Sequence, residues 1–194
     1  MALLFFLYLA VALRLDNNYF KGTVPTEVAL PNIQAFWAQR NQLTGTIPSE
    51  LGGLSKAYEI RLQYNGINGT IPEEIYSMPV LNRLDLFNAK LIGTISTSVG
   101  KLSNLQYFRI NDNKFSGTLP TEMGLLSNLQ QVWINGNDFS GTVPSELCAL
   151  RSSYGLTDLM ADCAPSVSTG KPAISCSSSC CTSCCAQDTG VCQA

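Results

Sequence analysis

Apolar residues recur along residues 7–150 with a period of about 24 residues. In each period two apolar residues flank a single residue of different character. Strict alternation of this kind predicts a short β-strand that buries one side and exposes the other. The apolar pairs are Leu13/Leu15, Phe36/Ala38, Ile60/Leu62, Leu84/Leu86, Phe108/Ile110 and Val132/Ile134.

A Gly-Thr dipeptide followed by an aliphatic residue marks the same point in each period. It begins at Gly22, Gly45, Gly69, Gly93, Gly117 and Gly141, so the spacing is 23 residues once and 24 residues four times. One such unit cannot bury its own apolar edge. The copies are therefore expected to stack, with their strands pairing in parallel over a continuous core.

An asparagine stands four residues before the glycine in five of the six periods, and a proline stands three residues after it in five. A buried carboxamide can satisfy the backbone groups of a turn, so we interpret this column as a structural ladder. The fourth period departs from both columns, with Ala89 and Ser96. The ladder residues are Asn18, Asn41, Asn65, Asn113 and Asn137.

The segment after each proline predicts a short helical or 3-10 turn on the outer side of the array, because proline is tolerated at the first position of a helix. Glutamates stand near the start of five of these turns, at Glu27, Glu50, Glu74, Glu122 and Glu146. Their complementarity to the helix dipole explains them more simply than a calcium-binding stripe does. We therefore expect no metal there.

The complete unit, LxxLxxLxLxxNxLxGTIPxELGxL, resembles the plant-type subclass of extracellular leucine-rich repeats over roughly residues 7–150. The resemblance implies an α/β-type solenoid, a right-handed superhelix with a parallel sheet on its concave side. Short 3-10 or helical turns and short strands would form the convex side. A repeat match of this kind is specific for the fold and says little about the ligand.

Residues that alternate with the core pairs must face outward from the expected sheet. Both tryptophans and five of the six arginines of the chain fall on this face. Arg, Trp and Tyr are enriched at binding hot spots, so the pattern predicts a ligand-binding concave face. The alternative is a surface charge ladder in which the tryptophans only cover apolar neighbours. The candidate residues are Arg14, Trp37, Arg40, Glu59, Arg61, Tyr64, Arg83, Asp85, Phe87, Tyr107, Arg109, Asp112, Gln131 and Trp133.

All eight cysteines lie near the C-terminus, at Cys148, Cys163, Cys176, Cys180, Cys181, Cys184, Cys185 and Cys192. This shift in composition predicts a repeat array over residues 1–147 and a Cys-rich cap and tail over residues 148–194. An even number of cysteines in a Ser/Thr-rich stretch favours disulfides formed in an oxidising compartment. Zinc bound by Cys180, Cys181, Cys184 and Cys185 is the weaker alternative, because the cysteines are adjacent and the chain has no histidine.

The ADC…CCTSCC pattern of this tail resembles the tails of secreted leucine-rich-repeat proteins from diatoms and related algae. A last half-strand is expected at Leu159 and Ala161. Many extracellular repeat arrays end in a cysteine pair, and by resemblance to these Cys148 and Cys163 are expected to form a disulfide.

Residues 1–13, MALLFFLYLAVAL, have two interpretations. They could be a secretory signal that ends in Ala10-Val11-Ala12, although the run is short and has no Lys or Arg before it. Leu7, Leu13 and Leu15 are in register with later repeats, which favours a first repeat. An N-terminal cap would then be missing, as in a fragment or an incomplete gene model. A membrane span is not expected, because it needs about 20 apolar residues.

The chain lacks histidine and the common nucleophile, phosphate-loop, dinucleotide and metalloprotease motifs, so we expect neither catalysis nor a cofactor. The net charge of −2 gives no general attraction to nucleic acid. Asn68-Gly69-Thr70 is a sequon for N-glycosylation at Asn68, consistent with secretion. We therefore expect a non-enzymatic secreted or cell-surface module that binds a protein, peptide or polysaccharide. The alternatives are an adhesive or structural wall protein without a specific ligand, or a metal-binding tail on an inert scaffold.

Overall fold

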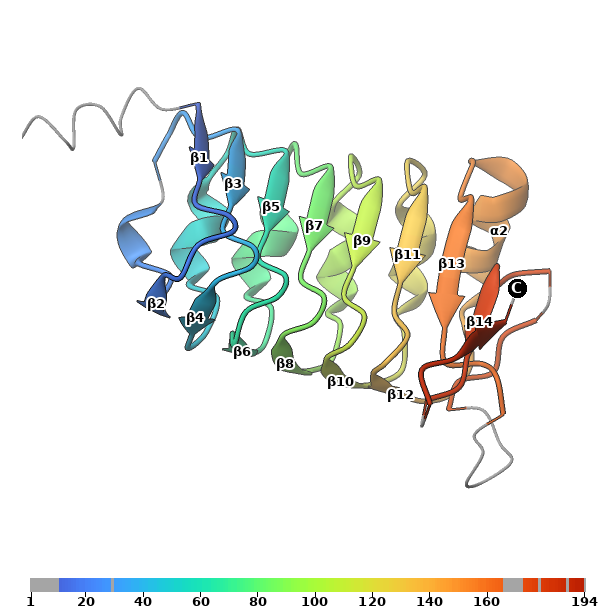
Figure 1. The fold of residues 1–194 in the computed structure, drawn as a ribbon. Helices are drawn as coiled ribbons and strands as arrows, with labels where there is room; N and C mark the ends of the chain where they lie inside the picture. Colours follow the sequence, from blue (N-terminus) through green and yellow to red (C-terminus); the bar gives the residue numbers. More distant parts are fainter. Residues whose placement is uncertain (1–10, 29, 166–172, 178, 188, 194) are drawn as a thin grey trace, which may run out of the picture.

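The computed structural model describes residues 11–28, 30–165, 173–177, 179–187 and 189–193. The chain winds into a solenoid in which each turn adds one strand to a single large sheet (Figure 1). This confirms the leucine-rich-repeat fold expected from the sequence. The repeat strands of the sheet are β1 (Ala12–Arg14), β3 (Ala35–Trp37), β5 (Glu59–Arg61), β7 (Arg83–Asp85), β9 (Tyr107–Arg109), β11 (Gln131–Trp133) and β13 (Asp158–Ala161).

All of these strands pair in parallel, and the central residue of each lies beside the central residue of the next. Leu13 pairs with Phe36, Phe36 with Ile60, and the register continues in the same way to Val132. The strand expected at Leu159 and Ala161 forms as β13 and continues the row. The open surface of this sheet is called the concave face below. It carries the first and third residue of each strand and continues into the turns that directly follow the strands, where Arg40, Tyr64 and Asp112 lie.

Two narrower sheets form the other edge of the solenoid. One contains β2 (Lys21–Thr23) and β4 (Gln42–Thr44), and the other contains β6 (Asn68–Gly69), β8 (Lys90–Gly93), β10 (Lys114–Gly117) and β12 (Asp138–Phe139). The back of the array carries the expected short turns. They are η1 (Thr26–Val28), η2 (Ser49–Gly53), η3 (Glu73–Ser77), η4 (Thr97–Lys101), η5 (Thr121–Leu125) and the α-helix α2 (Ser145–Ser153).

Successive turns on the back of the array pack closely because some of them carry glycine. A Cβ atom on Gly124 would lie 2.4 Å from Cβ of Glu146, and one on Gly100 would lie 2.9 Å from the backbone oxygen of Glu122. Any larger side chain would push neighbouring turns apart. These glycines of the outer turns therefore set how closely neighbouring turns stack on the back of the solenoid.

Each ladder asparagine after Asn18 joins two neighbouring turns; Asn137 is buried and the other three are half-buried. The side-chain amide of Asn113 donates to the carbonyls of Leu86 and Ile110, both at 2.9 Å, and its oxygen accepts from the amide of Leu91 at 3.0 Å. Asn41, Asn65 and Asn137 make equivalent bonds. Asn18 is exposed and donates to carbonyls of its own turn.

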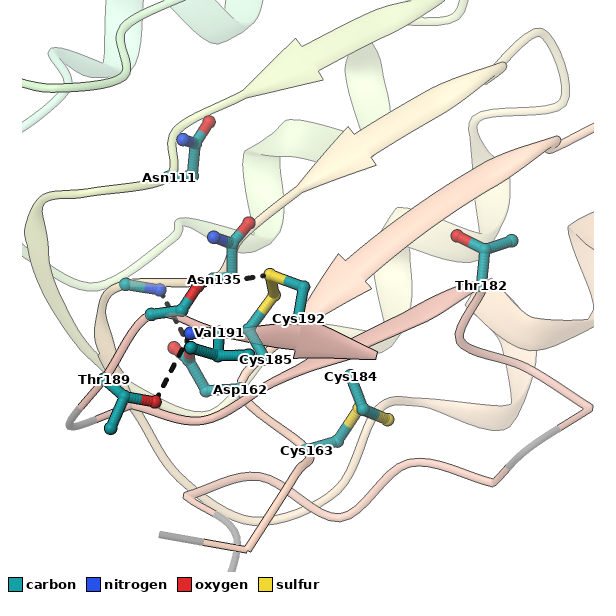
Figure 2. The surroundings of a disulfide bond; sticks show 12 residues. Asn111, Asn135, Asp162, Cys163, Thr182, Cys184, Cys185, Thr189, Val191 and Cys192 are labelled. Atoms are coloured by element: carbon teal, nitrogen blue, oxygen red, sulfur yellow. Dashed lines mark hydrogen bonds between the residues drawn. A yellow bond between two sulfur atoms is a disulfide. The ribbon is translucent and has the colours of Figure 1, made fainter. Parts of the chain in front are cut away.

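The tail extends the concave sheet by two strands. β14 (Ser183–Cys185) pairs in parallel with β13, and β15 (Cys192–Gln193) returns antiparallel to β14. The expected disulfides are present, and all eight cysteines are paired, as Cys148–Cys180, Cys163–Cys184, Cys176–Cys181 and Cys185–Cys192. Figure 2 shows the second and fourth of these pairs at the end of the sheet.

The predicted link between Cys148 and Cys163 is wrong. Cys148 lies on α2 at the back of the array, whereas Cys163 follows β13 in the sheet. The returning tail supplies a separate partner to each, because β14 lies beside β13 and places Cys184 next to Cys163. The four disulfides also conflict with the zinc alternative, since Cys180, Cys181, Cys184 and Cys185 are all bonded.

The expected division between residues 147 and 148 falls inside α2 and stays a prediction. Leu7 and most of the apolar N-terminal run lie outside the described residues, but β1 occupies the register expected of a first repeat. Among the residues that the structure describes, no helix is long and apolar enough to cross a membrane.

Candidate ligand-binding face

The centre of the concave face is a chain of ion pairs that crosses three strands. On β5, Arg61 pairs with Glu59 at 3.0 Å. From β7, Arg83 lies 3.6 Å from Glu59 and 3.7 Å from Asp85, and Arg109 on β9 lies 3.8 Å from Asp85. The sequence placed these five residues on one face. The structure shows that each acid is shared between two arginines.

Trp37 is held between two guanidinium groups. Arg14 on β1 lies 4.3 Å from the centre of its ring, and Arg61 on β5 lies 4.7 Å from it. These strands flank β3, so the arginines approach the ring from its two neighbours. The indole N–H donates to Glu59 at 2.8 Å. Trp37 therefore serves as a support that orients arginines by cation–π contact.

Arginines also lie over rings further along the sheet. Arg83 on β7 lies 3.9 Å from the ring centre of Tyr107 on β9, and Arg109 on β9 lies 4.3 Å from that of Trp133 on β11. Arg109 also donates to Gln131. The indole N–H of Trp133 donates to Asp158 at 2.7 Å, so this tryptophan is anchored to the last repeat strand.

Asp85 is the buried centre of the network, with 2% of its side chain exposed. Burial raises the pKa of its carboxyl, while Arg109, Arg83 and Arg61 oppose that shift. Burial likewise lowers the pKa of the Arg109 guanidinium, and Asp85 opposes that shift. The acid and the arginines therefore offset part of each other's desolvation.

A second cluster lies where the strands turn away from the sheet. Arg40 stands 4.8 Å from the ring centre of Tyr64, which packs edge-on against Phe87 at 5.2 Å. Arg40, Tyr64 and Asp112 all adopt a left-handed backbone, with φ of 56°, 57° and 55°. This conformation is uncommon for non-glycine residues, and here the repeat imposes it at the same point of each turn.

Asp158 and Asp162 lie beside the concave face although the repeat pattern of the sequence does not by itself indicate them. Asp162 accepts from the backbone amides of Gly136 at 2.9 Å and Asn137 at 3.2 Å. In earlier turns the equivalent backbone amides donate to backbone carbonyls of the next repeat instead. Burial raises the pKa of Asp162 most, its two amide donors lower it, and nearby acids raise it further. The register of the repeat strands could have indicated Asp162, because β13 continues the row of strands and Asp162 follows β13 directly (Figure 2).

Metal-binding chemistry finds little support in the described part of the chain. The one group of metal-ligand side chains close enough to share an ion is Cys163, Cys176 and Cys181, and all three sulfurs are in disulfides. On the back, Glu27, Glu50, Glu122 and Glu146 each accept a hydrogen bond from the Ser or Thr before them. Asn68 of the sequon is exposed.

Stacked parallel strands, an asparagine ladder and a row of turns on the back define a leucine-rich-repeat solenoid. The family model described as Leucine Rich Repeat matches residues 104–126 and 128–150. The chain has the leucine-rich-repeat solenoid fold with a disulfide-bonded C-terminal region, and it is similar to plant leucine-rich-repeat ectodomains. No curated protein sequence matches it.

Solved structures of plant proteins share this fold. The ectodomain of the Arabidopsis thaliana receptor kinase GASSHO1/SCHENGEN3, in complex with CASPARIAN STRIP INTEGRITY FACTOR 2, is 32% identical with a TM-score of 0.68, over 69% of this chain and 16% of that one. The Arabidopsis HAESA ectodomain, in complex with an IDA peptide hormone, is 29% identical with a TM-score of 0.71, over 77% and 24%. A plant ice-binding protein is 26% identical with a TM-score of 0.70, over 78% and 48%. The chain thus spans less than a quarter of either receptor ectodomain.

Proposed function

We propose that this chain is a non-enzymatic extracellular recognition module that binds an extended peptide across its concave face. The observation that carries the proposal is the row of arginines fixed by aromatic rings and shared acids. Side chains held in this way lose little conformational freedom when they bind a ligand. They also belong to the residue types that dominate binding hot spots.

A peptide fits this face better than a polysaccharide that stacks on tryptophan. Arg14 and Arg61 already lie over the ring of Trp37. From β1 to β13 there are six strand intervals of about 4.8 Å, so the face is about 29 Å long, enough for about nine extended residues at 3.3 Å each. The HAESA ectodomain described above was crystallised with a peptide hormone ligand, and the GASSHO1/SCHENGEN3 ectodomain in complex with CASPARIAN STRIP INTEGRITY FACTOR 2.

The extracellular assignment rests on the four disulfides, which persist in oxidising compartments. The non-enzymatic assignment rests on the absence of histidine from the sequence and on the concave carboxylates. Glu59 and Asp85 form ion pairs with arginines, which leaves neither carboxylate free for proton transfer.

Arg109→Ala and Trp133→Ala test the site. Both side chains lie on the concave face, so each change should weaken binding by about 1–3 kcal/mol, or about 5- to 150-fold in Kd, without unfolding the array. The measurement is titration calorimetry with peptides selected from a random library on the intact chain. Only the arginine change should also reduce the salt dependence of binding.

Glu50→Ala and Glu122→Ala are the controls, because both glutamates lie on turns at the back. They should leave Kd nearly unchanged. If peptides bind both concave-face variants with unchanged Kd but no longer bind the variants of the back, the concave site is ruled out. Self-association of the chain with no selectable peptide would instead favour the adhesive function.

A further inference from the structure

Charge is unevenly distributed along the concave face. Its arginines all lie on the first five repeat turns, at Arg14, Arg40, Arg61, Arg83 and Arg109. The one arginine later in the sequence, Arg151, lies on α2 and bonds to the tail at Cys180. From the turn after β9 onward, the charged residues next to the sheet within the described part of the chain are Asp112, Asp158 and Asp162, of which Asp162 is buried.

The acids among the arginines do not cancel this asymmetry at the surface. Asp85 is 2% exposed and Glu59 is 15% exposed, whereas the side chains of Arg61, Arg83 and Arg109 are 26%, 18% and 17% exposed. Three arginines share two acids here, which leaves one net positive charge. Arg14 and Arg40 are more exposed still, and among the described residues the only further acid beside them is Asp16, which follows β1, so the five arginines at this end outnumber the acids by two. A ligand over β1–β9 therefore meets mainly guanidinium groups.

The acids at the other end differ from Glu59 and Asp85 in their partners. Within the described residues, no Lys or Arg nitrogen lies within 4.0 Å of the carboxylates of Asp112, Asp158 or Asp162. Asp112 is exposed, and its carboxylate accepts only a neutral donor, Asn111, at 2.6 Å.

Like charges contribute to the pKa of one group at each end. Burial is the largest cause of the raised pKa of Asp162, the amides of Gly136 and Asn137 oppose that shift, and Asp112 and Asp138 add to it. Burial is also the largest cause of the lowered pKa of Arg109, Asp85 opposes that shift, and Arg83 and Arg61 add to it.

We propose that the concave face selects a bipolar peptide and binds it in one direction. This inference rests on the proposed function. Carboxylates of the ligand lie over the arginines of β1–β9, and its ammonium or guanidinium groups lie against Asp112, in the turn after β9, and Asp158 on β13. The reverse direction would place like charges together at both ends, which disfavours the wrong alignment.

Two nine-residue peptides of identical composition test the selection. In one, three Glu residues occupy one end and three Lys residues the other; in the second, Glu and Lys alternate. At low ionic strength the segregated peptide should bind at least about 10-fold more tightly than the alternating peptide, which corresponds to about 1.4 kcal/mol. The difference should nearly vanish at about 1 M salt, where charges are screened within about 3 Å.

The two native tryptophans report the direction of binding. Trp37 on β3 and Trp133 on β11 are four strand intervals apart, or about 19 Å. Trp133→Phe leaves only Trp37 fluorescent, and Trp37→Phe leaves only Trp133. At saturating peptide, a nitroxide on the Glu end should quench Trp37 more than Trp133, and a nitroxide on the Lys end should do the reverse.

Charge variants separate this inference from the proposed function. Arg83→Gln and Asp112→Asn should each reduce the preference for the segregated peptide several-fold, and asparagine tolerates the left-handed backbone at residue 112. Lys101→Gln and Glu50→Gln remove matched charges from the back and should leave the preference unchanged.

Equal affinity for the two peptides, the opposite quenching pattern, or no binding of either would overturn the inference. The concave site would still stand if Arg109→Ala weakened any peptide that binds. If peptides bind and no concave variant affects them, the proposed function itself fails.

Discussion

At the scale of single residues, Ala89 interrupts a column whose other buried members each serve two turns. An asparagine here would face the amide of Ile67 and the carbonyls of Leu62 and Leu86, by analogy with Asn65 and Asn113. Alanine satisfies none of them. Ser96, the other departure in this turn, is compensated, because its hydroxyl accepts from the amide of Ser98 at 3.1 Å.

Ala89→Asn should therefore stabilise the chain by roughly 1 kcal/mol. Asn113→Ala, the reciprocal change, should destabilise it by about 1–3 kcal/mol, because it leaves buried backbone groups without partners. Urea unfolding measures both. A destabilised Ala89→Asn variant, or hydrogen exchange that is slowest in residues 84–96, would contradict this account.

Asp162 predicts a pH-dependent contribution to stability. Asp162→Ala removes the acceptor of two backbone amides and should cost about 1–3 kcal/mol. The folded-state pKa is raised, so the folded chain holds this proton more tightly than the unfolded chain. The stability linked to that proton is fully present below the ordinary pKa of 3.8 and is lost as pH rises through the raised value. The cost of the variant should therefore shrink from acidic to neutral pH, and a cost that grows would be inconsistent with the raised pKa.

At the scale of elements, the disulfides of the tail differ in the loops that they close. Cys148–Cys180 closes a loop of 32 residues and Cys176–Cys181 one of 5. Loop entropy alone assigns about 3–4 kcal/mol to the longer loop and about 2 kcal/mol to the shorter. Replacing both cysteines of a pair by serine should destabilise the chain in that order in thermal unfolding. Native protein should show essentially no free thiol, and eight reactive thiols would contradict the fold of the tail.

The repeat strands could be predicted from sequence because the information is local and repeated. Leu84 and Phe108 occupy equivalent columns, and stacking fixes the rest. The tail has no second copy against which to align, so the pairing of Cys148 depended on where β14 returned. On the concave face, columns indicated which residues are neighbours but not which ring each arginine contacts. That choice depends on side-chain length and on acids such as Asp158 from a strand outside the regular spacing.

At the scale of the whole molecule, the chain is a row of units that contact mainly their neighbours, closed at one end by the tail. In such an array, loss of the terminal unit exposes the core of the next. Reduction of the disulfides should therefore cause unfolding to start at β13 and β11 and reach β3 last. Hydrogen exchange followed by peptide mapping checks this order, and earliest exchange at β5 or β7 would contradict it.

The reversed direction of strand β15 affects how the concave sheet could be extended by a second molecule. Every junction from β1 to β14 is parallel, so a solenoid that ended at β14 would offer a neighbouring molecule the same edge that each turn offers the next. Because β15 runs the opposite way and is only two residues long, a second molecule cannot continue the parallel row from its own β1. The hairpin of β14 and β15 therefore ends the parallel row of strands, and its outer edge differs from the edge that each repeat turn offers the next. The same hairpin belongs to the disulfide-bonded region that covers the core of the last repeat.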